Sequence, residues 1–253
     1  MAELDVDRLS LRFGGLHVLD EVSFAVAPGE LFALIGPNGA GKTSVFNCIC
    51  GLYRGSGRIT FAGQDVMGLD PARIARLGIG RTFQHGELFP HMTVLDNLLT
   101  ARHGLMQTGL LAEMFNARSV RRAEEAHRAK VEDVIEFVEL ERYRHTNVDD
   151  LPFGIQKVVG FARALATEPR LLLLDEPSAG LNRDEREDLA RFVLRLKHEL
   201  NLAMIWIEHD MQMIADLADR VHVLHYGQTL ASGTPEAVLN DPHVIEAYIG
   251  QEA

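Results

Sequence analysis

Apolar residues recur along the chain in two patterns that predict β-strands. Residues 9–13 and 22–26 alternate apolar and polar side chains, the period of a strand with one buried face. Residues 31–35 and 171–174 are unbroken apolar runs, typical of strands covered on both faces in a parallel sheet. Further strands are expected at residues 58–63, 203–207 and 221–224.

Helical periodicity fills much of the remaining sequence. Apolar side chains at positions 131, 134, 135 and 138 form one stripe of a helix. Helices are also expected from Lys42 onward, across most of residues 93–140, from Pro152 to about Pro169, and at residues 184–199, 211–217 and 241–250. After residue 160 helices and strands alternate, which predicts a parallel sheet with crossover helices. The helical stretch before that point reads as an inserted lobe.

Charge and length narrow the class of protein. The 253 residues include 36 acidic and 25 basic side chains, for a formal net charge of −11. An acidic chain without a basic stripe is poorly suited to nucleic acid, because phosphate neutralisation supplies most non-specific affinity. We therefore expect no nucleic-acid partner. The two cysteines, Cys48 and Cys50, read as small side chains in a reducing compartment.

The apolar runs are too short to cross a membrane. None approaches the roughly 18 residues that a spanning helix requires. Met1 is followed by the acidic residues Glu3, Asp5 and Asp7, unlike the positively charged start of a secretory signal. The sequence thus predicts a soluble, cytosolic protein whose role at a membrane, if any, depends on a partner.

A complete phosphate-binding motif, G-x-x-x-x-G-K-[ST], lies between the strand at residues 31–35 and the helix that follows. Its glycines allow backbone N–H groups to approach phosphates, and the helix start adds the positive end of a dipole. Lys42 supplies a cation for the β- and γ-phosphates, and the Thr43 hydroxyl is a candidate Mg²⁺ ligand. The residues expected to contact ATP are Gly36, Pro37, Asn38, Gly39, Ala40, Gly41, Lys42, Thr43 and Ser44.

Two carboxylates end the second buried strand. Asp175 is placed at the carboxyl edge of the predicted sheet, where it is expected to bind Mg²⁺. Glu176 is the candidate to polarise the attacking water. Pro177 favours a turn over an acidic helix cap. His209 follows the strand at residues 203–207, a position that is usually incidental, but together with these motifs it is a candidate γ-phosphate contact.

In order and spacing these motifs resemble the ATP-binding subunits of ABC transporters, and the resemblance runs nearly end to end. Residues 36–43 resemble the Walker A loop, residues 171–176 Walker B and residues 178–182 the D-loop. His209 matches the switch histidine, and Gln84 matches the glutamine that senses Mg²⁺ and couples the site to the membrane subunit. Phe13 is placed like the aromatic residue that stacks on adenine; a core position in the first strand is the alternative.

The segment ahead of Walker B departs from the general family. The family signature reads Leu-Ser-Gly-Gly-Gln, whereas this chain has Leu-Pro-Phe-Gly-Ile at residues 151–155. The serine that would meet the γ-phosphate of the opposite subunit is replaced by Pro152. Gly154 and the helix start after it still offer backbone N–H groups. We therefore expect this half-site to be weaker but present.

The resemblance implies a single ABC-type ATP-binding domain over residues 1–253. Its fold would be α/β: a P-loop (RecA-like) core with a mainly parallel sheet, an N-terminal antiparallel β subdomain and an inserted helical subdomain. The core and β subdomain would comprise residues 1–84 and 161–253, and the helical subdomain about 85–160.

Several segments are similar to one branch, the ATP-binding subunits of branched-chain (hydrophobic) amino-acid uptake systems. They include residues 77–84, 88–94, 176–182, 208–211 and 244–250. A Leu-Pro-aromatic-Gly signature is also familiar from that branch, which softens the departure at Pro152. Relatives for urea and short amides share much of the pattern, so the solute is implied by resemblance alone.

The same resemblance implies partners and a location. A second ATP-binding subunit is expected, a paralogue of which this chain resembles the longer, with a homodimer as the alternative in isolation. Two transmembrane permease subunits would follow, and indirectly a periplasmic or extracellular solute-binding protein. The chain would lie peripherally on the cytoplasmic face of the inner membrane. The region from Gln84 to about Leu99, with an exposed tract from His85 to Val94, is expected to receive the permease.

Two other classes compete with a transporter. A soluble ABC ATPase of DNA repair or translation would carry a long coiled-coil insertion or tandem cores, whereas this chain has one of each motif, a short helical lobe and an acidic balance. A kinase or GTPase with a phosphate loop would need an acceptor site or a guanine-reading motif such as Asn-Lys-x-Asp, and neither is found.

Overall fold

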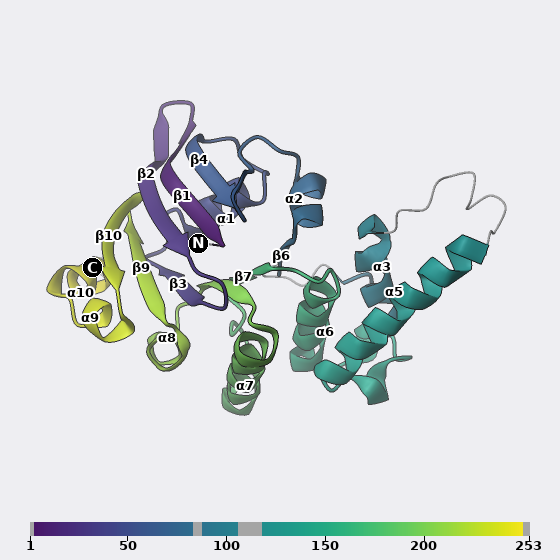
Figure 1. The fold of residues 1–253 in the computed structure, drawn as a ribbon. Helices are drawn as coiled ribbons and strands as arrows, with labels where there is room; N and C mark the ends of the chain where they lie inside the picture. Colours follow the sequence, from purple (N-terminus) through teal and green to yellow (C-terminus); the bar gives the residue numbers. More distant parts are fainter. Residues whose placement is uncertain (1–2, 83–87, 106–117, 250–253) are drawn as a thin grey trace. The chain divides into compact units, whose positions relative to one another are not determined.

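The computed structural model describes residues 3–82, 88–105 and 118–249 (Figure 1). The chain forms two compact units. One comprises residues 1–84 together with 170–253, and the other comprises residues 85–169.

A six-stranded sheet forms the centre of the first unit, with strand order β10-β9-β3-β8-β7-β6. The pairs β9–β3, β3–β8, β8–β7 and β7–β6 are parallel, and β10 joins antiparallel at the edge. Every residue of β3, β7 and β8 is buried, as expected for strands covered on both faces. The strand bounds are β3 Leu31–Ile35, β6 Ile79–Arg81, β7 Leu171–Asp175, β8 Ala203–Ile207, β9 Arg220–His225 and β10 Gln228–Gly233.

A four-stranded antiparallel sheet of order β2-β1-β4-β5 belongs to the same unit. Its strands are β1 Leu4–Phe13, β2 Leu16–Val26, β4 Ser56–Phe61 and β5 Gln64–Asp65. Buried side chains of this sheet, among them Leu4, Ile59 and Phe61, share one hydrophobic core with Phe46 of helix α1 and Phe32 of β3. The two sheets of the unit are therefore joined by burial of a common apolar core.

Within its described residues, the first unit also contains six helices: α1 Lys42–Ile49, α2 Pro71–Leu77, α7 Arg183–Leu200, α8 Met211–Leu217, α9 Pro235–Leu239 and α10 Pro242–Ile249. Their starts are encoded locally. Asn182 and Glu185 form a capping box at the start of α7, and the Asp210 carboxylate accepts two backbone N–H groups at the start of α8. Figure 1 shows α8, α9 and α10 beside the β9 and β10 edge of the sheet.

The second unit is helical. It contains α3 Val94–Arg102, α5 Arg118–Phe137 and α6 Phe153–Leu165, with short 3₁₀ turns at His103–Leu105, Glu141–Tyr143 and Val148–Asp150. The side chain of Arg102, which is 4% exposed, connects two segments of this unit. Its guanidinium donates to the Ala166 carbonyl and forms an ion pair with Glu168 at 2.9 Å. Because both charges are partnered, burial of the arginine is tolerated.

The predicted α/β fold class is confirmed, with the parallel core sheet and the antiparallel sheet both present. Most predicted strands and helices were found within a few residues of their expected bounds, but β1 and β2 begin five and six residues earlier than predicted. Residues 106–117 of the expected helical stretch lie outside the described residues. Five short helices and strands, β5, α2, β6, β10 and α9, had not been predicted. None of the helices described is long and apolar enough to span a membrane.

His222 of β9 is a buried histidine that the nucleotide site does not use. Its ring lies 5.3 Å from Phe24 and 6.0 Å from Phe32, and Nε2 is 3.1 Å from the Thr229 hydroxyl. Burial, reinforced by the Arg220 guanidinium, lowers the pKa of His222 to about 4. The folded protein therefore resists a proton that the unfolded chain binds near the ordinary pKa of 6.5.

We predict that stability falls as pH drops from about 6.5 to about 4, because the unfolded chain takes up the His222 proton first. The loss over that interval should be about 1 to 3 kcal/mol. Urea unfolding followed by circular dichroism at several pH values measures it. His222→Gln should flatten this part of the pH profile, and His225→Gln, on the same strand, should not. Equal slopes in wild type and His222→Gln would contradict the prediction.

Candidate nucleotide-binding site

The phosphate-loop motif forms a tight turn between β3 and α1. Gly36 and Gly41 have φ angles of +148° and +105°, in the region that favours glycine. A Cβ atom on Gly36 would lie 2.1 Å from the Leu224 carbonyl oxygen, and one on Gly41 would lie 2.7 Å from a Leu19 methyl group. The glycines are therefore required by close packing of this loop against β9 and β2.

Lys42, at the first position of α1, is 6% exposed. Its Nζ atom donates to the Gly36 carbonyl at 2.6 Å and to the Pro37 carbonyl at 3.1 Å. The ammonium group is thus held at the concave side of the loop, which satisfies a buried cation with backbone acceptors. Thr43 and Ser44 follow in the first turn of α1, with Thr43 exposed and Ser44 half-buried.

Asp175 ends β7 and is 6% exposed. Its carboxylate forms an ion pair of 2.7 Å with Arg81, the last residue of β6. The same guanidinium donates to the Asn47 side chain of α1 at 2.7 Å. Arg81 therefore connects the acidic end of β7 to the helix that follows the phosphate loop.

Glu176 lies next to Asp175 with φ = +46°, a left-handed conformation that is uncommon outside glycine. Its backbone N–H donates to the Ile207 carbonyl at 2.9 Å, which ties the start of this loop to the end of β8. Its side-chain Oε1 lies 3.1 Å from Nε2 of His209. Backbone strain of this kind occurs often where a side chain must point in one fixed direction.

Electrostatics connect these groups. Burial lowers the pKa of Lys42, and the carboxylates of Glu176 and Asp175 oppose that shift. Both carboxylates therefore lie close enough to act on the lysine charge. The structure brings Lys42, Asp175, Glu176 and His209 together at the carboxyl ends of β3, β7 and β8.

Three other expected site residues are placed differently. Gln84 lies outside the described residues, as does His85. Phe13, at the end of β1, is 50% exposed, and its ring meets Tyr53 edge-on at 5.1 Å between centroids, so it is not a core residue. Gly154 lies in the first turn of α6, in the helical unit. The preceding Pro152 supplies no side-chain cap to that helix.

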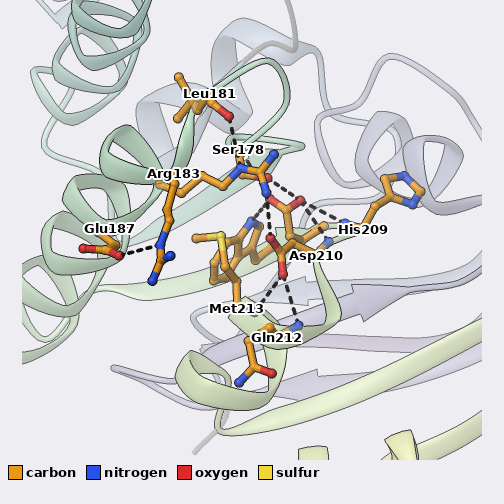
Figure 2. Close-up of polar contacts among 11 residues, drawn as sticks. Ser178, Leu181, Arg183, Glu187, His209, Asp210, Gln212 and Met213 are labelled. Atoms are coloured by element: carbon orange, nitrogen blue, oxygen red, sulfur yellow. Dashed lines mark hydrogen bonds and ion pairs between the residues drawn. The ribbon is translucent and has the colours of Figure 1, made fainter.

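Two residues beside the site had no predicted role. Arg81 was part of a family motif, yet nothing in its local sequence pointed to Asp175. Glu208 directly precedes His209 and is 3% exposed. Figure 2 shows that Ser178 and the His209–Asp210 segment converge from different loops, and the Glu208 carboxylate accepts hydrogen bonds from both. A charged residue at the end of a wholly buried strand was the available signal for Glu208.

Comparisons with known proteins agree with this geometry. The model of the family "ABC transporter" matches residues 19–179, more than half of the chain, and the model "Branched-chain amino acid ATP-binding cassette transporter" matches residues 228–253. The high-affinity branched-chain amino acid transport ATP-binding protein LivG of Escherichia coli (strain K12) is 41% identical over 249 residues, 98% of either chain.

The chain belongs to the ABC transporter family. It is an ATP-binding subunit of the kind that hydrolyses ATP to power transport. The equivalent protein BraF of Pseudomonas aeruginosa is 40% identical to this cassette, over 98% of either chain. Among solved structures, the ADP conformation of MJ1267, an ATP-binding cassette of an ABC transporter, superposes with a TM-score of 0.87 at 33% identity, covering 99% of both chains.

We predict that Gly36→Ala destabilises the cassette strongly, because its Cβ meets a backbone oxygen that has no room to move. The expected loss of unfolding free energy is on the order of 3 kcal/mol or more. Gly39→Ala is the matched control, since Gly39 also has a positive φ, +79°, but has nothing within 4 Å of an added Cβ. It should lose only about 1 to 2 kcal/mol. Urea unfolding of both variants measures the difference, and equal losses would refute the packing argument.

Proposed function

We propose that this cassette binds Mg-ATP and hydrolyses it to drive uptake of branched-chain amino acids through separate membrane subunits. One observation carries the proposal: Glu176 and His209 face each other at 3.1 Å beside Lys42 in a chain that matches branched-chain transport ATP-binding proteins over 98% of its length. The assignments of individual residues below are part of the proposal.

The phosphate loop supplies the nucleotide contacts. Backbone N–H groups of Gly36 and of residues 38–44, together with the Lys42 ammonium, bind the phosphate oxygens, and the start of α1 adds its dipole. The Thr43 hydroxyl and the Asp175 carboxylate are hard oxygen ligands suited to Mg²⁺, which keeps several waters and needs few protein ligands. Gln84 completes this set. The bound ion would neutralise charge that develops on the phosphates during transfer. Phe13, half exposed at the end of β1, is the residue we assign to adenine stacking.

The chemical step rests on positioning and charge. Glu176 orients the attacking water and accepts its proton, as a carboxylate held within hydrogen-bond reach can do. His209, 3.1 Å from Glu176 Oε1, holds that carboxylate and contacts the γ-phosphate. Lys42 stabilises the charge that builds on the phosphate oxygens. The fixed φ of Glu176 makes this geometry available before the nucleotide arrives.

A second ATP-binding subunit completes the site. In the proposed cycle its signature segment and D-loop close over the γ-phosphate, so ATP joins the subunits and hydrolysis separates them. The signature segment of this chain would offer the γ-phosphate backbone N–H groups from Gly154 and the start of α6, without a serine hydroxyl. We propose a paralogous subunit as the partner, with the cassette bound peripherally at the cytoplasmic face of the inner membrane.

The segment before α3 is our proposed contact with the permeases. Phe89 and Met92 are 41% and 37% exposed, which is unusual for large apolar side chains so near each other. Asn97, fully buried, shapes this segment: its Oδ1 accepts the Phe89 N–H at 2.8 Å. Its Nδ2 is shared among the carbonyls of Phe89, Met92 and Thr93 at 3.1 to 3.4 Å. Residues 88–93, the described part of this segment, are therefore held in place by Asn97 while Phe89 and Met92 face solvent.

We predict that Lys42→Ala abolishes steady-state ATP turnover and that Glu176→Gln slows it strongly, for different reasons. Lys42→Ala removes a phosphate cation and should weaken nucleotide binding. Glu176→Gln removes the proton acceptor, so it should bind ATP, accumulate as a dimer and hydrolyse about 10² to 10⁴ times more slowly. Phosphate release and size-exclusion chromatography with ATP separate the two. Rapid hydrolysis by Glu176→Gln would exclude Glu176 as the base.

The proposed function is tested by uptake of labelled leucine in cells that lack this gene and any redundant carrier. Restoration by wild type but not by Glu176→Gln is the expected result. If deletion leaves leucine uptake unchanged, the branched-chain assignment is wrong. Uptake of urea and short amides by the same strains then tests the other solutes that the sequence pattern admits.

We further predict that Asn97→Ala uncouples hydrolysis from transport, because four backbone groups of the proposed permease contact each lose a hydrogen bond to its side chain. Leucine uptake should fall about tenfold, while ATP hydrolysis by the purified cassette changes less than about threefold. Asn240→Ala, the same substitution at an exposed asparagine, is the control and should leave both unchanged. Parallel losses of uptake and hydrolysis in Asn97→Ala would place its effect in the ATP site or in folding instead.

A further inference from the structure

The carboxylate of Glu208 is buried among five hydrogen-bond donors. Oε1 accepts from the Ser178 hydroxyl at 2.7 Å, from the His209 N–H at 2.9 Å and from the Asp210 N–H at 3.4 Å. Oε2 accepts from the Ser178 N–H at 3.3 Å and from the Trp206 indole N–H at 3.1 Å. Each oxygen therefore bonds to Ser178 and to a residue of the segment around Glu208 itself.

The donors come from the two loops that carry the proposed catalytic pair. Ser178 lies in residues 176–182, the loop that begins with Glu176. His209 and Asp210 lie in residues 208–210, the loop after β8. Glu208 is thus a connection between the loop of Glu176 and the loop of His209, whose side chains meet at 3.1 Å.

A second connection joins the same loops farther from the site. The Arg186 guanidinium donates to the Leu181 carbonyl at 3.1 Å and forms an ion pair with Asp210 at 3.2 Å. This pair is partly exposed, so it is weaker than a buried bridge of the same length. The Glu208 bridge is buried, where unmet hydrogen bonds cost most.

We infer that Glu208 is a positioning residue for ATP hydrolysis: its carboxylate fixes the 176–182 loop against the 208–210 loop and so sets the distance between Glu176 and His209. The inference rests on the proposed function for the roles of those two side chains. Glu208 itself does not contact ATP in this arrangement. It therefore governs the rate of the chemical step and not the affinity for nucleotide.

Glu208→Gln tests this with almost no change in size. An amide nitrogen at the Oε1 position would face the His209 and Asp210 N–H groups, and at the Oε2 position it would face the Ser178 and Trp206 N–H groups. In either orientation donors oppose donors, so the two loops lose part of their connection. A shift of the catalytic groups by a fraction of an ångström is sufficient to slow the reaction.

The expected result for Glu208→Gln is a fall in kcat of about tenfold or more, with the dissociation constant for a fluorescent ATP analogue within about threefold of wild type. Ser178→Ala should lower kcat in the same direction. The double variant should be no slower than Glu208→Gln alone, because both changes break one connection. Trp206 is the chain's only tryptophan, so a changed emission spectrum in Glu208→Gln reports directly that its indole N–H has lost the carboxylate.

Glu3→Gln is the matched control. Glu3 is another buried carboxylate of the same unit, 7% exposed and paired with Arg170 at 2.9 Å, and it has no contact with either loop. It should lower the unfolding free energy while leaving kcat within about twofold of wild type. If Glu208→Gln behaves like Glu3→Gln, with stability lost and kcat kept, Glu208 is a structural residue and the inference is wrong.

Two further results, a variant that does not fold and an inactive wild type, also have a defined meaning. If Glu208→Gln does not fold, Ser178→Ala decides, and a kcat within about twofold of wild type overturns the inference. If wild type itself does not hydrolyse ATP, the proposed function fails, and with it the inference. If wild type hydrolyses ATP and the Glu208 and Ser178 variants do so equally fast, only the inference fails.

Discussion

The register of three parallel strands is the constraint on which the site depends. Ala33 of β3 and Leu174 of β7 both pair with Trp206 of β8, so the strands reach the same edge of the sheet within two residues of one another. The phosphate loop, the Glu176 loop and the Glu208 loop then begin side by side. Residues far apart in sequence meet because backbone hydrogen bonds of the sheet fix where each strand ends. A shift of β7 by one residue would move Asp175 to the opposite face.

Burial of charge at that edge determines the local chemistry. Lys42 is held by two backbone carbonyls, Asp175 by Arg81, and Glu208 by N–H and O–H donors alone. Each charge is satisfied within a few ångströms, which limits the cost of placing several charges in a poorly solvated region. The Arg81 partner also means that Asp175 already balances a cation in this state. A metal ion bound there would share that carboxylate with Arg81 or displace it.

The sequence was most informative where chemistry is encoded in adjacent residues. The phosphate loop and the Asp175–Glu176 pair could be predicted because each is continuous and flanked by an unmistakable buried strand. The contacts of Arg81 with Asp175 and of Ser178 with Glu208 could not be predicted, since they join residues 94 and 30 positions apart and leave no local pattern.

Strand β6 was not predicted because three residues, one of them glycine, are too few to show a period. Phe13 shows the reverse case: its alternation with Leu9 and Leu11 suggested burial, but at the strand end it turns to solvent beside Tyr53.

The loop that carries Glu176 is held at three separate points. Its first residue is tied to β8 through the Ile207 carbonyl, its middle to Glu208 through Ser178, and its end to Asp210 through Leu181 and Arg186. A residue in a strained conformation, as Glu176 is, keeps its geometry only when the surroundings over-determine it. These hydrogen bonds and the Arg186–Asp210 ion pair restrain the loop, and they all connect it to β8 or to the loop after β8. The 176–182 loop and the His209 segment are therefore connected at several points along their length, so a displacement of one loop strains the hydrogen bonds that join it to the other.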